Sequence, residues 1–283
     1  MKLTDVIAIN LSNHNVNSVF GVQGGAVVHI FDSIHKITDI KVCYNHHEQG
    51  SALAAVANAK ANKTIGVCVV TTGPGTTNAM TGLLSAWQDS IPVLFLSGQT
   101  RKEQTSYGKN VRQRGSQECN IIDVIKPWTK AQYLISEESD IEKIMSEAIN
   151  IAMEPRRGPV WIDLPVNLQW TNVGITNRLD KINKKIKSHS IEDPIKSKID
   201  NLVAKINTSE KPILILGRNF IPGEYHHLFL KYASKYSLPV LTTWGSAGTA
   251  GGKVNHVGII GVSGQQAANL ALRSADLAIF IGC

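Results

Sequence analysis

Short runs of apolar residues alternate with amphipathic stretches along this chain of 283 residues. The run over residues 64–71 is apolar enough to predict a strand that is buried on both faces, as in a parallel sheet. In stretches such as 139–153, apolar residues recur every three or four positions, which predicts helices. The regular alternation of strand and helix predicts a parallel, layered α/β sheet.

The pattern predicts the elements of a first domain in order. A first helix begins with Thr4 as its cap and turns Ile7 and Leu11 inward. Residues 101–115 show no periodicity and predict a loop over the sheet. The other predicted strands are 18–22, 40–44, 64–71, 92–97 and 159–164, and the predicted helices are 26–35, 47–61, 76–87, 121–125 and 139–153.

A polar, Lys/Asn-rich stretch over residues 171–193 predicts a linker between two domains. The first domain then covers residues 1–170, and residues 194–283 form a second α/β domain. Its predicted strands are 212–216, 239–243 and 277–281, and its predicted helices are 225–236 and 265–273. Because the chain stops directly after an apolar strand, we expect this doubly wound second domain to be partial.

Charge and cysteine content narrow the class of protein. The formal net charge is +7, and much of the excess lies in the predicted linker, at Lys181, Lys184, Lys185 and Lys187. With few aromatic residues nearby, this run favours a solvated linker over a nucleic-acid-binding surface. The four cysteines form no CxxC pair, and no uncharged apolar run reaches the ~20 residues of a membrane span. We therefore expect a soluble cytoplasmic protein without a membrane or nucleic-acid partner.

Glu48 is the first residue that the pattern marks for chemistry. It follows the predicted strand 40–44 and opens a helix, and open α/β sheets bind ligands where strands end and helices begin. From position alone, Glu48 either acts on a ligand or only complements the helix dipole. The adjoining His46 and His47 are expected to point apart, so no metal site is predicted.

Glycines follow two of the predicted strands. Gly24-Gly25-Ala26 comes after strand 18–22, and Thr72-Gly73-Pro74-Gly75 comes after strand 64–71. Glycine lets the backbone approach a flat ligand closely, although turns also require it. Neither segment matches the P-loop or the dinucleotide-binding GxGxxG pattern.

Taken in order, these motifs resemble the N-terminal, pyrimidine-binding domain of the acetolactate synthase family of thiamine diphosphate (ThDP) enzymes. The quoted order is Val19-Phe20-Gly21-Val22-Gln23-Gly24-Gly25-Ala26, His47-Glu48-Gln49-Gly50, Thr72-Gly73-Pro74-Gly75-Thr76-Thr77-Asn78, Asp89-Ser90-Ile91-Pro92 and Ser97-Gly98-Gln99. Further on, Gln117-Glu118, Lys126-Pro127-Trp128-Thr129-Lys130 and Arg157-Gly158-Pro159-Val160 fit the same family. Pro239-Val240-Leu241-Thr242-Thr243 resembles the start of the family's central domain.

The resemblance implies a role for each of these segments. It places Glu48 as the catalytic carboxyl group that shares a proton with N1′ of the cofactor's pyrimidine. It places Gln117 near the pocket of a small 2-oxo acid substrate, in a carboligase or decarboxylase of branched-chain amino acid biosynthesis. The residues that it places around the pyrimidine are Gly24, Gly25, Ala26, Thr72, Gly73, Pro74 and Asn78.

Two residues depart from the family pattern. The family usually has proline where this chain has Gln23, and phenylalanine where it has Ser116. A serine enlarges and polarises a spot near the substrate, so a related ThDP lyase acting on another substrate fits the sequence as well.

The resemblance also implies partners and cofactors. Family members hold the cofactor's diphosphate through Mg²⁺ in a third domain marked by Gly-Asp-Gly, and this chain contains no such motif. We therefore expect the chain to form a homo-oligomer, to pair with a separate chain that carries that domain, or both. The alternatives are a truncated product, a fragment or a non-catalytic assembly module. The family's central domain can also hold FAD.

Overall fold

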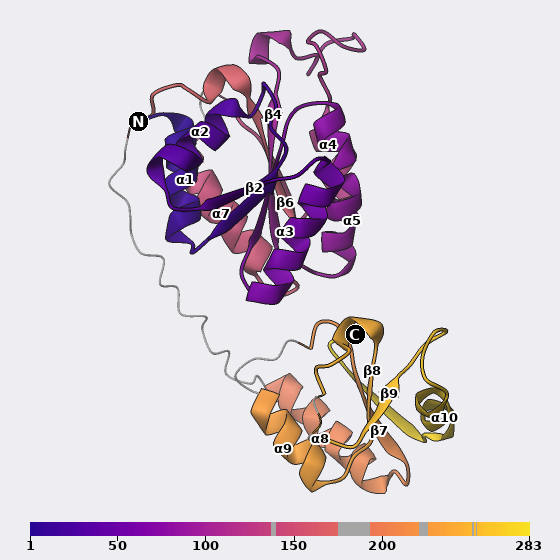
Figure 1. Ribbon diagram of the computed structural model, residues 1–283. Coiled ribbons are helices and arrows are strands. Elements are labelled where there is room, and N and C mark those ends of the chain that lie inside the picture. Colours follow the sequence, from indigo (N-terminus) through magenta and orange to yellow (C-terminus); the bar gives the residue numbers. More distant parts are fainter. Residues whose placement is uncertain (137–139, 175–192, 221–225, 251, 253) are drawn as a thin grey trace. The chain divides into compact units, whose positions relative to one another are not determined.

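The computed structural model describes residues 1–136, 140–174, 193–220, 226–250, 252 and 254–283. The chain divides into two compact units, residues 1–177 and 178–283, which are considered separately (Figure 1). Most of the linker predicted over residues 171–193 lies outside the described residues.

Six parallel strands form the sheet of the first unit, in the order β2-β1-β3-β4-β6-β5. The central strand β4 is paired with β6 from Leu94, opposite Val160, to Gln99, opposite Pro165. The strands are β1 (Ser18–Gly21), β2 (Lys41–Tyr44), β3 (Gly66–Val70), β4 (Val93–Gln99), β5 (Ala131–Leu134) and β6 (Val160–Pro165).

Helices cover both faces of this sheet. Helices α1 (Leu3–Asn13), α2 (Val28–Ile37) and α7 (Ile141–Met153) contribute to the core on one face. Helices α3 (Glu48–Asn62), α5 (Met80–Gln88) and α6 (Ile121–Ile125) contribute to the core on the other. Successive residues of β3 alternate between the two, as the pleat requires: Val67 faces the first core and Cys68 the second. The predicted three-layer α/β arrangement is confirmed.

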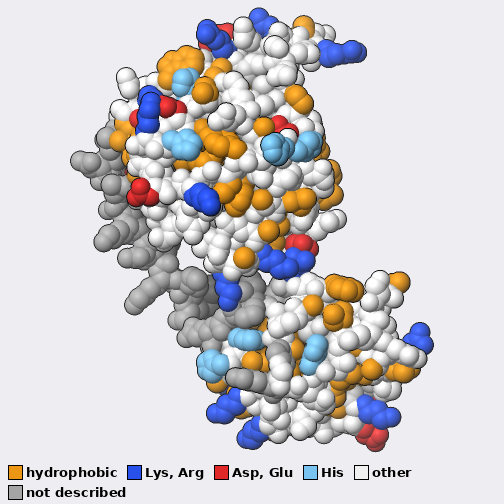
Figure 2. Space-filling view, in the orientation of Figure 1, with side chains coloured by type: hydrophobic (Ala, Val, Ile, Leu, Met, Phe, Trp, Pro, Cys, Tyr) orange, Lys and Arg blue, Asp and Glu red, His pale blue; other side chains and the backbone are white. Residues whose placement is uncertain are grey.

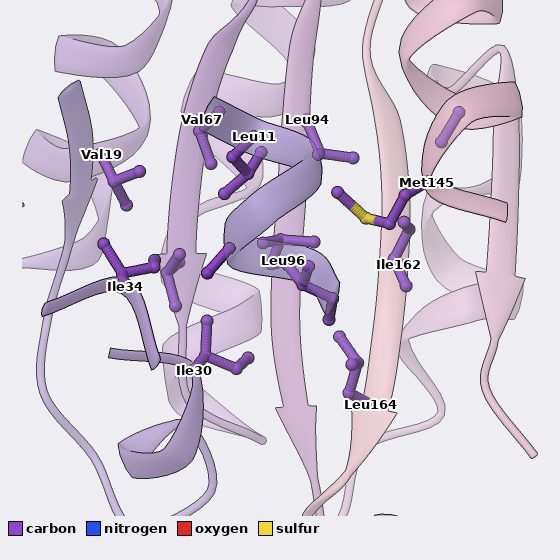
Figure 3. Close-up of a cluster of buried hydrophobic side chains, with 14 of the residues drawn as sticks. Leu11, Val19, Ile30, Ile34, Val67, Leu94, Leu96, Met145, Ile162 and Leu164 are labelled. Carbon is purple, nitrogen blue, oxygen red and sulfur yellow. The ribbon is translucent and has the colours of Figure 1, made fainter. Parts of the chain in front are cut away.

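The first core is made of aliphatic side chains from helices and strands. Figure 3 shows Leu11 of α1 and Met145 of α7 lying over Leu94 and Leu96 of β4 and Ile162 of β6. All five side chains are fully buried. Burying each contributes about 1.5–3 kcal/mol relative to leaving it in water. The sheet is therefore a rigid base for the loops at its ends.

Helices α3 and α5 meet through small residues, Ala52 and Gly82. The side chain of His47 caps α3 by accepting a hydrogen bond from the Gln49 N–H at 3.1 Å, and Lys63 ends it in a left-handed conformation. A Cβ atom added to Gly82 of α5 would lie 2.3 Å from the Cβ of Ala52. Glycine at position 82 is thus required by the contact between the helices.

The second unit contains a parallel sheet of four described strands, in the order β10-β7-β8-β9. Hydrophobic clusters lie on both faces of it, with α9 on one face and α10 on the other, so this unit is doubly wound as predicted. Its elements are α8 (Asp193–Thr208), β7 (Pro212–Leu216), α9 (His226–Lys235), β8 (Val240–Thr242), β9 (His256–Ile259), α10 (Gln266–Ser274) and β10 (Leu277–Ile281). None of the helices in the described ranges is long and apolar enough to cross a membrane.

Some elements differ from the predictions. The cap of α1 is Lys2, and Thr4 lies inside the helix, where its hydroxyl contacts Ser33. The helix predicted over residues 76–87 consists of α4 (Pro74–Asn78) and α5, because Pro74 fits the first turn of a helix and begins it early.

Three elements were not predicted. Strand β5 lies at the edge of the sheet and β9 is short, so neither shows a run of buried residues. Helix α8 has a charged sequence, and none of its described side chains is buried, so its apolar residues gave a weak signal.

Two glycine-to-alanine changes in helices should have opposite effects on stability. Alanine favours a helix over glycine by about 0.8–1 kcal/mol. At Gly50 of α3 an added Cβ meets open space, so Gly50→Ala should raise the free energy of unfolding by up to about 1 kcal/mol. Gly82→Ala should lower it by about 1–3 kcal/mol, because α3 and α5 must move apart. Urea denaturation followed by circular dichroism measures both, and a gain at both positions would contradict the close packing of α3 on α5.

Candidate functional site

The candidate site lies at the carboxyl end of the first unit's sheet, where the chain changes direction. From β1 the chain runs through α2 to β2 on one side, and from β3 it runs through α4 and α5 to β4 on the other. The connecting helices α2 and α5 cover opposite faces of the sheet. In open α/β sheets, ligands bind in a crevice where connections diverge in this way, so the expected crevice lies between the ends of β1 and β3.

Glu48 is the first residue of α3 and lies against the segment that follows β3. Its carboxylate is half-buried, and its Oε2 accepts a hydrogen bond from Nδ2 of Asn78 at 2.9 Å. Among the described residues, Oε1 has no hydrogen-bond partner, and it lies 3.6 Å from where a Cβ on Gly75 would stand. One oxygen of Glu48 is therefore fixed by the protein, while the other can accept or share a proton with a ligand.

The turn after β3 brings the Gln117 segment to the site. Gly73 has φ +63°, and a Cβ at this position would lie 2.3 Å from the carbonyl oxygen of Gln117. The hydroxyl of Thr72 lies 3.2 Å from the same oxygen. Position 73 therefore requires glycine. Any other residue would be strained at this positive φ, and its Cβ would push Gln117 away.

Gln117 itself has a left-handed backbone, with φ 57°, and its side chain is exposed. Such a conformation costs a residue other than glycine about 1–3 kcal/mol and persists where its surroundings impose it. Strain of this kind is common at functional sites, and the place of Gln117 near a substrate stays a prediction.

The segment after β1 has two kinds of residue. A Cβ on Gly24 would lie 2.5 Å from Cβ of Thr71, so this loop touches the turn after β3. Gly25 is exposed, with open space where a side chain would be. Ala26 is buried, and its carbonyl oxygen accepts a hydrogen bond from Nε2 of Gln169 at 2.6 Å. Ala26 thus anchors the loop, while the glycines leave room above it.

A buried polar cluster, made of Ser97, Gln99, Trp161 and Asp163, lies under these loops. Ser97 Oγ donates to Asp163 Oδ1 at 2.5 Å and accepts from Trp161 Nε1 at 2.7 Å. Gln99 Nε2 donates to Asp163 Oδ2 at 3.0 Å. Burial raises the pKa of Asp163 to about 7, although the hydrogen bonds from Ser97 and Gln99 act to lower it. Its pKa thus lies far above that of an exposed aspartate.

The loop between β4 and α6 is held by one carboxylate. Glu118 accepts hydrogen bonds from the backbone N–H groups of Ser106, Arg114 and Gly115. Although burial acts in the opposite direction, these bonds hold the pKa of Glu118 below its usual value. Figure 2 shows Lys and Arg side chains at this end of the unit, where the loop carries Arg101, Lys102, Lys109, Arg112 and Arg114.

The structure therefore brings the predicted residues together in two contacts. Glu48 meets Asn78, and Gln117 meets Thr72 and Gly73. Gly25 and Pro74 are exposed and lie after β1 and β3 respectively. The roles of Gln99, Asp163 and Glu118 were not predicted, although a polar residue within an apolar strand, as at Ser97, Gln99 and Asp163, is a signal that could have found two of them.

No predicted site residue lines the cavity found in the described part of the chain. This cavity of about 470 Å³ is lined by Lys102, Glu103, Thr105, Tyr107, Lys109, Leu134, Ile135, Ser136 and Pro165. Among the described residues, no group of three or more His, Cys, Asp or Glu side chains could hold a metal ion.

Comparison with protein families agrees with this arrangement. Residues 1–124 match the model of the thiamine pyrophosphate enzyme, N-terminal TPP binding domain. Residues 199–283 match the model of the thiamine pyrophosphate enzyme, central domain. The two matches fall on the first and second units respectively.

Characterised relatives narrow the family further. The chain is 33% identical to the acetolactate synthase large subunit of Lactococcus lactis subsp. lactis, over 99% of this chain and 47% of that protein. It is 31% identical to the acetolactate synthase of Arthrospira platensis, over 99% and 49%, and 29% identical to the isozyme 3 large subunit of Escherichia coli K12, over 98% and 48%. The chain therefore belongs to the acetolactate synthase family of thiamine pyrophosphate enzymes, and it spans about half the length of these relatives.

The raised pKa of Asp163 predicts a specific dependence of stability on pH. A carboxyl with a pKa of about 7 in the folded state and about 3.9 when unfolded stabilises the fold fully below pH about 4, and this contribution is lost as the pH rises to about 7. The unfolding free energy of the wild type minus that of Asp163→Asn should therefore fall by up to about 4 kcal/mol across this range and then level off. Urea denaturation at a series of pH values measures it, and a constant difference would show that Asp163 is ionised throughout.

Proposed function

We propose that this chain supplies the pyrimidine-binding side of the active site in an acetolactate synthase-like, ThDP-dependent carboligase or decarboxylase of small 2-oxo acids. The observation that carries the proposal is the hydrogen bond between Glu48, at the start of the helix that follows β2, and Asn78, in the helix that follows β3. Membership of the acetolactate synthase family supports it.

The residues present fit a flat heteroaromatic ring. Gly25 leaves open space at the crevice, and Gly73 keeps the turn after β3 close to Gln117. Glu48 offers one oxygen that no described residue uses. Glu48 would hold such a ring through a nitrogen at the ring's edge.

Within this proposal, each residue has a distinct task. ThDP, when bound, supplies the nucleophilic C2 carbon of its thiazolium ring. Glu48 holds a proton at N1′ of the pyrimidine, and Asn78 orients the carboxylate through its hydrogen bond at 2.9 Å. Gln117 presents its exposed side chain toward the 2-oxo acid, and Ser116, which is also exposed, adjusts the choice of substrate.

The rest of the site is proposed to come from sequence that corresponds to the other half of the relatives. We infer that Mg²⁺ and the cofactor's diphosphate bind there, in a separate chain or in a further part of the same polypeptide. We also propose assembly into a homo-oligomer or with such a partner. FAD is proposed as a second ligand, bound by the second unit. The absorbance spectrum of the purified protein tests whether it binds.

The role of Glu48 can be tested by Glu48→Gln. After activity is reconstituted with a matching C-terminal half, this change should slow hydrogen–deuterium exchange at C2 of bound ThDP by about 10²–10⁴, because glutamine keeps the hydrogen bond but shares no proton. Folding should hardly change, since loss of a charge at a helix N-terminus costs about 0.3–1 kcal/mol. NMR spectroscopy measures the exchange.

Glu142→Gln is the matched control, because Glu142 also lies in the first turn of a helix, α7, in the same unit. It should leave C2 exchange unchanged. Wild-type exchange in the Glu48→Gln complex would mean that Glu48 serves only the helix dipole and would favour a non-catalytic role for the chain.

The division of the site predicts weak cofactor binding by the 283-residue chain alone. Without charge-assisted contacts to the diphosphate, ThDP should bind with a dissociation constant on the order of millimolar. Isothermal titration calorimetry with and without Mg²⁺ measures this. Tight binding that requires Mg²⁺ would show that the chain holds the diphosphate itself.

A further inference from the structure

Gln99 connects three segments of the candidate site through its side-chain amide. It is the last residue of β4 and is buried. Its Oε1 accepts hydrogen bonds from Thr72 Oγ1 at 3.0 Å and from the N–H of Thr100 at 2.9 Å. Its Nε2 donates to the carbonyl oxygen of Cys119 at 2.8 Å and to Asp163 Oδ2 at 3.0 Å. One side chain therefore joins the turn after β3, the segment that follows Gln117, and β6.

The orientation of this amide is determined by its neighbours. The N–H of Thr100 can only donate, so Oε1 of Gln99 must face it, and Nε2 must face Cys119 and Asp163. All four hydrogen bonds of Gln99 are then satisfied. A flipped amide would oppose donor to donor at Thr100 and acceptor to acceptor at Cys119.

The group at position 163 must accept hydrogen bonds on both of its oxygens. Trp161 Nε1 can only donate, so Ser97 accepts from it and turns its own O–H toward Asp163 Oδ1. Gln99 donates to Oδ2. A carboxyl group fits these two donors, whereas an amide at position 163 would place its NH₂ against one of them.

The segment that this arrangement holds has a strained backbone. Gln117 has φ 57°, which is maintained only if contacts on both sides fix it. The single hydroxyl proton of Thr72 lies between two acceptors, Oε1 of Gln99 at 3.0 Å and the carbonyl oxygen of Gln117 at 3.2 Å, and Gln99 binds the carbonyl oxygen of Cys119. Because Thr72 is itself bound to Gln99, both contacts pass through one glutamine.

We propose that Gln99, oriented by Asp163, is a positioning residue that fixes segment 117–119 against the Thr72–Gly73 turn, and so sets the distance between the substrate side and the cofactor side of the site. The assignment of one side to the substrate and the other to the cofactor rests on the proposed function. The mechanical role of Gln99 does not, and it can be measured on the chain itself.

Hydrogen exchange followed by mass spectrometry tests the positioning role through Gln99→Met. Methionine keeps the length and much of the volume of glutamine but makes none of the four hydrogen bonds. Backbone amides of peptides covering residues 105–120 should exchange about tenfold or more faster, because loss of the Cys119 contact also frees the loop held by Glu118. Amides of β3 and β6 should keep their protection relative to global unfolding.

Gln169→Met is the matched control. Gln169 is also a fully buried glutamine that donates to two carbonyl oxygens, those of Ala26 and Leu164. Its loss should speed exchange around residues 24–26 and leave residues 105–120 unchanged. The proposal would be overturned if exchange in residues 105–120 became equally faster in both variants, or no faster in Gln99→Met. Gln99 would then be an ordinary contributor to stability.

The pH dependence of exchange provides a readout that a purely structural role would not change. The titratable groups that face Asp163 are Tyr107 and Cys119, and burial together with Asp163 raises the pKa of both, so they stay neutral near pH 7. Since the pKa of Asp163 is about 7 when buried, an opening that admits water to it becomes easier as the pH rises from about 4 to about 7. After correction for intrinsic exchange, residues 105–120 should lose protection over this range in the wild type.

Asp163→Asn is a second variant, which tests the proposal even if Gln99→Met does not fold. It should loosen residues 105–120 at low pH, because its NH₂ opposes a donor, and it should abolish the pH dependence. A pH-independent wild type would contradict the coupling of Asp163 to this segment. Failure of the reconstituted complex to bind ThDP would refute the proposed function and leave these exchange results standing, so the two outcomes are distinguishable.

Discussion

Burial of both faces of the parallel sheet is the constraint on which the rest of the structure depends. A polar atom placed between two layers of helices has no water to bind, so it must find a partner within the protein. Most residues of β3, β4 and β6 meet this constraint by being apolar. Ser97, Gln99 and Asp163 meet it by binding one another and the loops above them. The same rule that makes the core dry thus builds the support for the candidate site.

The two parts of the candidate site are held in place in different ways. The Glu48–Asn78 pair is a direct contact between helices that begin at the ends of different strands. The Gln117 segment, in contrast, depends on groups beneath it, because its own backbone is strained. A site built in this way keeps Glu48 and Gln117 in register without requiring the exposed loop to be rigid by itself.

Much of this arrangement could be predicted from the sequence, and the limits have physical causes. The strands that became β3, β4 and β6 were predicted because burial on both faces leaves a continuous apolar run. Strand β5 was missed because it lies at the edge of the sheet, where one side is unpaired and the pattern is mixed. Gly73 was marked from its place after a strand, but its positive φ and its contact with Gln117 depend on a segment more than forty residues away. Contacts between segments that are far apart in the sequence produce no periodic pattern of apolar residues. The hydrogen-bond donors that orient Gln99 likewise cannot be predicted from such a pattern.

The hold of Glu118 on its loop has a consequence for how this family can diversify. One carboxylate binds three backbone N–H groups, from Ser106, Arg114 and Gly115, and backbone groups are present whatever side chains the loop carries. Residues between these anchor points can therefore change through neutral drift without loss of the loop's path, provided that residue 118 remains glutamate. A solvent-exposed loop can then acquire new side chains one substitution at a time, while its path and the sheet beneath it stay the same.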